Sequence, residues 1–558
     1  MQRARQVTSL SNDISFMRNV VVLLSPFKTR LVFALVCTIL GSGIVIINPL
    51  LSRAIVDEGI IALDFSLLLR MLGLFAVLFV VKRLLDFLEF QQFVKINKIL
   101  EFRLSFNAHN HLLKLPKSYF KENNETQIIG DLRVDIGKIT QLADRFMFMS
   151  FTQVFGIIGS TVGLLLIDSL MLALVLLTIP LKLVVARYFA RRHEKLISKL
   201  IEYYSIFGAS LGDAVSNIEV MKLWNLRRSR LVRFTREQKD IIHTEIKISY
   251  NDKMNENVDS FISFVLNVAM YMVGFWGIAS SRLTIGGLFA FMTYTTQIVG
   301  PITFLTRIRH HIADIKPSLK RYIDFLNLQE EGSSGKEGVS VPDKIVFDNV
   351  SLAYEDGVPR LNDVSFELVK GQKVAIVGEN GSGKSSIINL LLRLCEPSSG
   401  AIRFGDQSIA DFDIDKYRGL FSVVSQDVRL FNETVRKNVD PNYTKTNDEI
   451  ISTFKQWGFA DLLDELPDGL DTSVGNNGGK LSGGQRQKVS AVRAMLRGAK
   501  IIVLDEATSN YDSRSEEVFN KIVNESDGFD YIIAITHQKA MLDKVDRVIH
   551  IKDGTVLQ

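Results

Sequence analysis

The residues best suited to chemistry lie in the C-terminal part of the chain, in the run KVAIVGENGSGKSSIINLLLRL (373–394). An apolar, strand-like run leads into a glycine-rich loop that ends in Lys384 and Ser385, and an amphipathic helical pattern follows. Glycines at this spacing let backbone amides wrap around phosphate oxygens, the lysine reaches the β- and γ-phosphates, and the serine hydroxyl can coordinate Mg²⁺. The sequence therefore predicts an ATP-binding loop formed by Gly378, Glu379, Asn380, Gly381, Ser382, Gly383, Lys384, Ser385 and Ser386.

Two further apolar runs end in polar residues. In KIIVLDEATS (500–509), the apolar part is followed by Asp505 and Glu506, about 120 residues after the loop. In YIIAITHQ (531–538), His537 follows the apolar part. The carboxyl ends of parallel strands meet at one edge of a sheet, where ligands bind. We expect Asp505 to hold Mg²⁺, directly or through water, and Glu506 to position or deprotonate the attacking water.

A second glycine-rich segment, SVGNNGGKLSGGQRQKVS (473–490), leads into another helical pattern. Its LSGGQ part offers backbone amides and a serine hydroxyl at a helix N-terminus, where the helix dipole favours anions. It has no lysine of its own in the phosphate position. The segment is therefore expected to cover a phosphate that is held elsewhere.

The elements that must position these residues follow from the distribution of apolar residues. Crossing a bilayer takes about 20 mostly apolar residues, and six segments of this kind occur, at about 31–50, 67–90, 146–166, 170–189, 258–280 and 285–306. The predicted fold class is a membrane α-helical domain (1–328) with six transmembrane helices and long intracellular extensions, fused through a linker (329–342) to an α/β P-loop nucleotide-binding domain (343–558). The alternative is a large soluble helical core, which would have to bury six separate apolar segments.

Charge orients the predicted spans. The chain has 66 Lys and Arg against 61 Asp and Glu, a net charge of +5, and the long segments between spans are rich in basic residues. The positive-inside rule places the N-terminus, these segments and the C-terminal domain in the cytoplasm. Basic residues that fix topology explain this modest excess, so no nucleic-acid partner is expected. The two cysteines, Cys37 and Cys395, fall in different domains, so neither a disulfide framework nor a zinc site is expected.

The second predicted span contains charged residues: Lys82, Arg83, Asp86 and Glu89. Charges at that depth are costly and face a cavity or each other. Lys82 and Asp86 are four residues apart and can form an ion pair within the helix. Alternatively the helix is already leaving the bilayer, or Lys82, Arg83 and Asp86 line a substrate cavity.

With LSGGQRQ (481–487) added to the loop and the DE pair, the chain resembles the half-transporters of the ATP-binding cassette (ABC) exporter family over nearly its whole length. The resemblance implies that Tyr354 stacks on adenine, that Gln426 senses Mg²⁺ and the γ-phosphate, and that His537 contacts the γ-phosphate. It assigns SNYD (509–512) to the D-loop, and it assigns Ser482, Gly483, Gly484 and Gln485 to the ATP held by a partner subunit. It thereby implies a dimer. A homodimer is favoured because no site residue is degenerate, and a heterodimer is the alternative.

The chain also departs from the family pattern. Ser473 and Asn476 stand where relatives often have glutamates, and SNYD replaces the commoner SALD. The sequence stops at Gln558 without the usual C-terminal helix, and no protease-like domain precedes the first span, so self-cleavage of a leader peptide is not expected.

The predicted function is ATP-driven export across the bacterial cytoplasmic membrane by alternating access. ATP hydrolysis would use Glu506, His537 and Lys384. A peptide or small amphipathic antibiotic is the first expectation for the substrate, and a multidrug exporter or a lipid flippase of the same architecture is the alternative. A regulatory ATPase that transports nothing is a third possibility.

Overall fold

A computed structural model of the chain describes residues 16, 18–123, 125–143, 145–332, 335–336, 338–353, 358–425, 428–505, 528–536 and 542–557. These residues divide into two compact units. We call Met1–His109 with Ile128–Asn327 the helical unit, and Asn110–Gln127 with Leu328–Gln558 the sheet unit.

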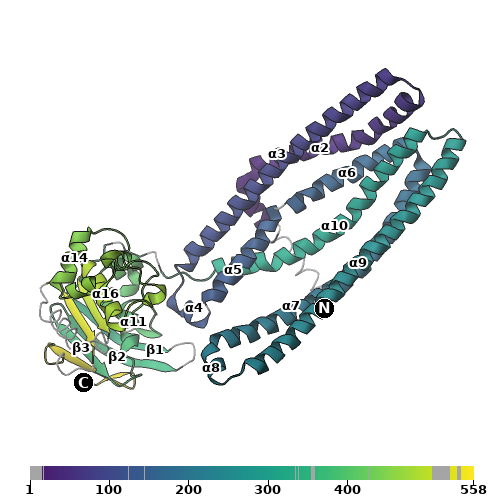
Figure 1. Ribbon diagram of the computed structural model, residues 1–558. Coiled ribbons are helices and arrows are strands. Elements are labelled where there is room, and N and C mark those ends of the chain that lie inside the picture. The colour runs from purple at the N-terminus through teal and green to yellow at the C-terminus, as the bar shows by residue number, and fades with distance from the viewer. Residues whose placement is uncertain are drawn as a thin grey trace. The chain divides into compact units, whose positions relative to one another are not determined.

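Long helices make up the helical unit (Figure 1). The main helices are α2 (Lys28–Ala54), α3 (Phe65–Leu112), α5 (Glu125–Thr140), α6 (Arg145–Ile167), α7 (Ser169–Ser216), α8 (Ile218–Leu223), α9 (Arg227–Ala279) and α10 (Ile285–Leu326). Shorter turns are η1 (Ser25–Phe27), the π-helical η2 (Ile55–Ile61) and η3 (Gln141–Ala143).

Several of these helices are long and apolar enough to cross a membrane. By length and composition of the described residues, four qualify: Arg18–Ile61, Phe65–Leu112, Ser169–Ser216 and Arg227–Ala279, with a shorter apolar helix at Thr152–Ile167. The sixth predicted span falls within α10, and its membrane crossing stays a prediction. The helices extend far beyond the predicted apolar segments because the charged segments that follow are also helical.

Two structural details explain how neighbouring helices pack. Asp168 is the single residue between α6 and α7, and its carboxylate accepts hydrogen bonds from the amides of Leu170 and Met171. The same carboxylate forms an ion pair with the Arg282 guanidinium at 2.6 Å. A Cβ on Gly163 would lie 2.5 Å from the Tyr294 ring, so a glycine is needed where α6 meets α10. The Tyr294 hydroxyl in turn donates to the carbonyl of Ile46 at 2.6 Å, which ties α10 to α2.

Polar contacts hold α7 against α9 along most of their length. The Lys182 ammonium, with 1% of its side chain exposed, donates to the Asp259 carboxylate at 2.7 Å and to the Ser263 hydroxyl at 2.8 Å. Further along the same pair of helices, His193 contacts Asp252 at 2.9 Å, Tyr204 contacts Glu245 at 2.7 Å, and Arg230 contacts Asp213 at 3.0 Å. The two helices therefore form a long antiparallel hairpin that α8 closes.

The described residues of the sheet unit form two sheets. The six-stranded sheet has the order β10-β9-β3-β8-β7-β6 and the four-stranded sheet the order β2-β1-β4-β5. The strands are β1 (Lys344–Ala353), β2 (Pro359–Val369), β3 (Lys373–Gly378), β4 (Ser399–Phe404), β5 (Gln407–Ser408), β6 (Phe421–Val424), β7 (Ile501–Asp505), β8 (Tyr531–Ile535), β9 (Arg547–Lys552) and β10 (Thr555–Leu557). The helices are α4 (Lys117–Glu122), α11 (Lys384–Leu391), α12 (Ile414–Gly419), α13 (Val435–Val439), α14 (Asn447–Gln456), α15 (Ala460–Glu465) and α16 (Gly483–Leu496).

Strand β7 shows why the sheet strands are continuous apolar runs. Ile501 and Val503 belong to one buried cluster, and Ile502 and Leu504 belong to another. Both faces of the strand are therefore covered, as expected where β7 runs parallel to β6 and β8.

Residues 110–127 belong to the sheet unit, although the sequence placed them within the domain 1–328. The amide of Glu331 donates to the carbonyl of Lys114 at 2.8 Å, and the Lys117 ammonium donates to the Asn389 side chain at 3.3 Å. His111 lies 2.8 Å from the Glu330 carboxylate. These long-range contacts leave no signal in the local sequence pattern.

Candidate nucleotide-binding site

The loop between β3 and α11 has a backbone that depends on glycine. Gly381 and Gly383 have φ values of 85° and 107°, in the left-handed region that residues with a Cβ rarely adopt. A Cβ on Gly383 would also lie 2.8 Å from the carbonyl oxygen of Arg360, and one on Gly378 would lie 2.2 Å from that of Ile551. The glycine spacing seen in the sequence is thus required by the close approach of other backbone segments.

Lys384 begins α11 and lies almost entirely buried, with 6% of its surface exposed. Its ammonium donates to the carbonyl of Gly378 at 2.7 Å and to that of Glu379 at 3.0 Å. The ammonium group is therefore held at the start of the loop by these two carbonyl oxygens. Ser385, the next residue, is exposed, and so are Glu379 and Asn380, while Ser386 is half-buried.

The Ser382 hydroxyl tests whether this loop fits a phosphate group. It is buried and has no hydrogen-bond partner within the part of the chain that the structure describes. A buried hydroxyl without a partner is costly, and a phosphate oxygen would supply the missing acceptor. This hydroxyl, the glycine backbone and the lysine together fit a polyphosphate.

Asp505 is the last residue of β7 and lies at the carboxyl edge of the sheet. Asp505 and Ile376 of β3 both pair with Ile535 of β8, which lies between their strands. The two residues are therefore level, with backbones about 10 Å apart at roughly 4.8 Å per strand. Asp505 therefore ends its strand at the same edge of the sheet at which β3 leads into the loop.

The oxygen ligands present fit Mg²⁺ rather than a metal held by protein alone. The Ser385 hydroxyl and the Asp505 carboxylate are hard oxygen ligands, and Mg²⁺ is usually held by one or two such groups together with substrate phosphates. Among the described residues there is no group of three or more His, Cys, Asp or Glu that could hold a metal.

The segment that the sequence predicts to cover a phosphate, Ser482 to Gln485, forms the N-terminus of α16. The Ser482 hydroxyl accepts from the amide of Gln485 at 3.2 Å, and the Gln485 side-chain oxygen accepts from the amide of Ser482 at 3.0 Å. The Gln485 side-chain amide donates to the Glu465 carboxylate at 3.0 Å. Ser482 and Gly483 are exposed, and Gly484 and Gln485 are half-buried, so this helix end faces outward.

The segment before this helix is held by the backbone. The amide of Val474 donates to the carbonyl of Glu433 at 3.0 Å, and Val474 is buried. Gly478 has a φ of 71° and lies so close to Arg486 that a Cβ would be 2.7 Å from its side chain. Ser473 and Asn476, the positions that depart from the family pattern, are both exposed.

Several predicted site residues lie outside the described residues: Tyr354, Gln426, Glu506, His537 and the SNYD segment 509–512. Their roles stay predictions. The described site therefore brings together the loop 378–386 and Asp505, with the 482–485 helix end in the same unit.

The charged residues of α3 form the contact expected of an ion pair within one helix. The Lys82 ammonium donates to the Asp86 carboxylate, and both side chains are about one-quarter exposed. A Cβ on Gly41 of α2 would lie 3.2 Å from the Lys82 nitrogen, so the pair packs against α2. Arg83 lies over the Phe79 ring at 5.2 Å. This geometry supports the ion-pair interpretation, and contact with a substrate stays a prediction.

Sequence reasoning missed two features. The Glu465 carboxylate accepts a hydrogen bond from Gln485, which lies twenty residues later in the chain, and Lys182 is buried beside Asp259 and Ser263. The spacing S-x-x-Q at 482–485 is a recognisable helix-capping pattern, but no local signal identifies Glu465 or the partner of Lys182.

Comparison with known proteins agrees with this architecture. The family model for the ABC transporter transmembrane region matches residues 31–302, and the ABC transporter model matches residues 361–509. The ATP-dependent lipid A-core flippase of Thiobacillus denitrificans is 27% identical over 514 residues, which cover 91% of this chain and 89% of that protein. The flippase of the same name from Neisseria meningitidis serogroup A is 29% identical over 451 residues, 80% of this chain and 72% of that protein.

A solved structure shares the fold. A bacterial Atm1-family ABC exporter with ATP bound superposes with a TM-score of 0.81 at 22% identity, covering 95% of this chain and 94% of that chain.

These findings confirm the predicted fold class, a membrane helical domain joined to an α/β ATP-binding domain. They also confirm ATP hydrolysis coupled to transport, and a multi-pass location in the cytoplasmic membrane with the ATP-binding domain in the cytoplasm. The chain belongs to the ABC transporter family, as a half-transporter of the exporter type that carries one transmembrane region and one ATP-binding domain.

Proposed function

We propose that two copies of this chain form a transporter that uses Mg²⁺ and ATP to move a lipid-type amphiphile across the cytoplasmic membrane. The relatives named above are lipid A-core flippases. They support the lipid alternative over the peptide that the sequence placed first, and neither supports a peptide. The proposed substrate is an amphiphile with acyl chains and an anionic head.

The dimer rests on one observation: each chain carries two complementary half-sites. The loop holding Lys384 forms a phosphate cradle, and the exposed N-terminus of α16 at Ser482 is a donor-rich surface without a lysine. A γ-phosphate held by the loop alone would be open to water on one side. The α16 terminus of a second copy would close it, because its amides and dipole favour an anion.

The chain's own residues perform the ATP chemistry. The Lys384 ammonium exchanges the carbonyls of Gly378 and Glu379 for phosphate oxygens, and the Ser382 hydroxyl gains an acceptor. Ser385 and Asp505 would hold Mg²⁺, which would offset the negative charge of the phosphates during hydrolysis. Glu506 would orient or deprotonate the attacking water, and His537 would contact the γ-phosphate.

Helix α3 offers a surface suited to a lipid-type substrate. Its most apolar stretch contains no buried residue, and Phe79, Val80, Leu84 and Phe87 are each more than half exposed. These side chains flank the Lys82–Asp86 pair and Arg83. Apolar side chains around cationic groups would receive acyl chains and an anionic head together.

The test uses the full chain in liposomes that contain a fluorescent phospholipid. A membrane-impermeant quencher then measures the labelled lipid in the outer leaflet with and without ATP. We expect ATP-dependent redistribution and lipid-stimulated ATP hydrolysis, and Glu506→Gln should bind ATP while abolishing both.

Competing outcomes are separated in the same liposomes. Transport of added peptides or drugs without lipid redistribution would overturn the lipid substrate but leave the ATPase assignment. Hydrolysis by Glu506→Gln at the wild-type rate would overturn the assignment of the base.

A further inference from the structure

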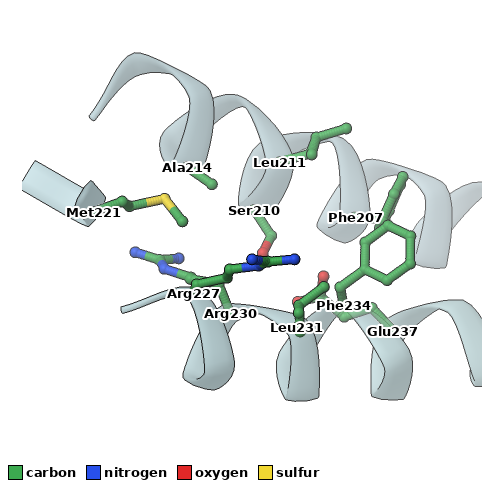
Figure 2. A pocket seen from close by; sticks show the side chains of 10 residues that line it. All are labelled: Phe207, Ser210, Leu211, Ala214, Met221, Arg227, Arg230, Leu231, Phe234 and Glu237. Carbon is green, nitrogen blue, oxygen red and sulfur yellow. The ribbon is translucent and has the colours of Figure 1, made fainter. Parts of the chain in front are cut away.

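A pocket of about 200 Å³ lies between α7 and α9 (Figure 2). Its walls are mostly apolar, and Met221 of α8 closes one end. The residues that line it include Phe207, Ser210, Ala214, Arg227, Phe234 and Glu237. Nothing in the ATPase or transport chemistry above uses this pocket.

Short side chains on α7 create the space. Ser210 and Ala214 are one helical turn apart and face the hollow, whereas Phe207 and Phe234 meet edge to face at 5.5 Å and close it on the side of the predicted span. An apolar cavity of roughly 150 Å³ accepts benzene. This pocket therefore has room for a ring system or a short aliphatic chain.

Its position excludes a lipid lying in the bilayer. Ser210 follows Lys182, which lies in a predicted span, by 28 residues on the same helix, which corresponds to about 42 Å at roughly 1.5 Å per residue. An occupant must therefore enter from the aqueous phase on the cytoplasmic side.

The charge at the α8 end favours an anion. Helix α9 begins at Arg227 with no acidic residue in its first turn and no side-chain cap at Leu226. Negative charge is favourable at this positive end of a helix, and here Arg227, Arg228 and Arg230 occupy it. Asp213 pairs with Arg230, whereas Arg227 has neither an ion pair nor a side-chain hydrogen bond to any residue that the structure describes. At the other end, Glu237 is paired with Arg233.

We infer that this pocket binds a small cytoplasmic amphiphile that has an anionic head and an apolar body about the size of two fused rings. The head lies at Arg227 and Arg230, and the body lies between Phe207, Leu231 and Phe234. Since the pocket spans α7, α8 and α9, a bound ligand would fix the tip of this hairpin.

The probe is 2-naphthalenesulfonate, titrated calorimetrically into the full chain in lipid nanodiscs, with empty nanodiscs subtracted. The neutral 2-naphthalenemethanol has the same ring body and tests the need for charge. Neither measurement requires transport or ATP hydrolysis, so the outcome is independent of the proposed function.

Two variants with matched controls locate the site. Ser210→Phe fills the pocket, and Ser198→Phe makes the same change three turns away on the exposed side of α7. Arg227→Gln removes a lining cation, and Arg228→Gln changes the neighbour that does not line the pocket.

We expect saturable binding of the sulfonate that Ser210→Phe weakens at least tenfold and Arg227→Gln at least fivefold, with both controls unchanged. The neutral alcohol should bind at least fivefold more weakly. Absence of saturable binding, or equal binding by Ser210→Phe and wild type, would overturn the inference. Disulfide-linked dimers formed through Leu211→Cys, introduced alone, would also overturn it, since the groove would then be an interface between two copies.

Discussion

The ammonium of Lys384 lies 2.7 Å from the carbonyl oxygen of Gly378, so the first residue of α11 folds back onto the last residue of β3. The charge is thus placed at the mouth of the loop before any phosphate arrives. Binding a nucleotide requires only that the ammonium exchange carbonyl oxygens for phosphate oxygens.

Removing this ammonium should disable the site without unfolding the sheet unit. Lys384→Ala is expected to weaken ATP binding about 10- to 100-fold, because hydrogen bonds to charged groups contribute roughly 1.5–3 kcal/mol, and to abolish hydrolysis. Fluorescent-nucleotide titration and phosphate release measure the two effects. Lys370→Ala, at a half-exposed lysine paired with Asp530, is the control and should change neither. Wild-type affinity in Lys384→Ala would remove the lysine from the site.

Mixed dimers can show whether each ATP site is built from two chains. Lys384→Ala and Ser482→Arg should each prevent nucleotide occlusion in a homodimer, the arginine by its bulk at the N-terminus of α16. In a dimer with one copy of each, both defects fall in the same composite site and the other site is intact. Co-purified mixed dimers, isolated with two different tags, should therefore recover occlusion at one site. Failure to recover any occlusion would favour sites contained within one chain.

Glu465 is predicted to position the side chain of Gln485 at the N-terminus of α16. Its carboxylate accepts from the Gln485 side-chain amide at 3.0 Å, while the Gln485 oxygen accepts from the amide of Ser482. Glu465→Ala should raise the ATP concentration at half-maximal hydrolysis about two- to tenfold, because an exposed hydrogen bond contributes roughly 0.5–1.5 kcal/mol.

The variant Glu465→Gln tests whether Glu465 acts by positioning Gln485 or by its charge. Glu465→Gln keeps an acceptor for Gln485 and should restore most of the wild-type KM, with kcat little changed in both variants. Asp464→Ala, at the exposed neighbouring acid, is the control. Equal loss in Glu465→Ala and Glu465→Gln would show that charge, and not the position of Gln485, is what matters.

Lys182 is expected to depend on its acid partner for stability. Asp259→Ala would leave an almost fully buried ammonium without its counter-ion, at a cost of about 3–5 kcal/mol, and should lower the Tm in detergent by roughly 5–10 °C. The double variant Lys182→Leu with Asp259→Leu should recover most of the loss, because no charge is left buried. Asp252→Ala removes the partner of the more exposed His193 on the same helices and should have little effect. A smaller shift for Asp259→Ala than for Asp252→Ala would contradict the burial argument.

The sequence predicted those features that depend on local spacing. Gly378 to Ser385 could be assigned because a phosphate loop needs its glycines, lysine and serine within eight consecutive residues, and the structure requires glycine at 381 and 383. Asp505 could be placed at a strand end because β7 is buried on both faces and its apolar run stops there. Membrane helices could be predicted because a bilayer imposes a minimum apolar length.

The helix lengths and the division into units were harder to predict. The apolar segment 170–189 lies within α7, which continues to Ser216 through residues whose polar pattern is equally compatible with other structures. Residues 110–127 comprise the end of α3 and the segment after it, and they contact Glu330, Glu331 and Asn389. Such contacts join residues more than 200 positions apart, and periodicity carries no information about them.

The sequence by itself determined the chemistry of this protein: a phosphate loop with Lys384, acids after a buried strand, and an LSGGQ helix start that lacks its own lysine. These follow from residue types at short range, where backbone geometry leaves few choices. Only the tertiary structure decided that Asp505 is level with Ile376, that Glu465 holds Gln485, and that Ser210 and Ala214 open a pocket beside Arg227. Those relationships depend on how strands register and helices pack, and packing is set by many side chains acting together across the chain.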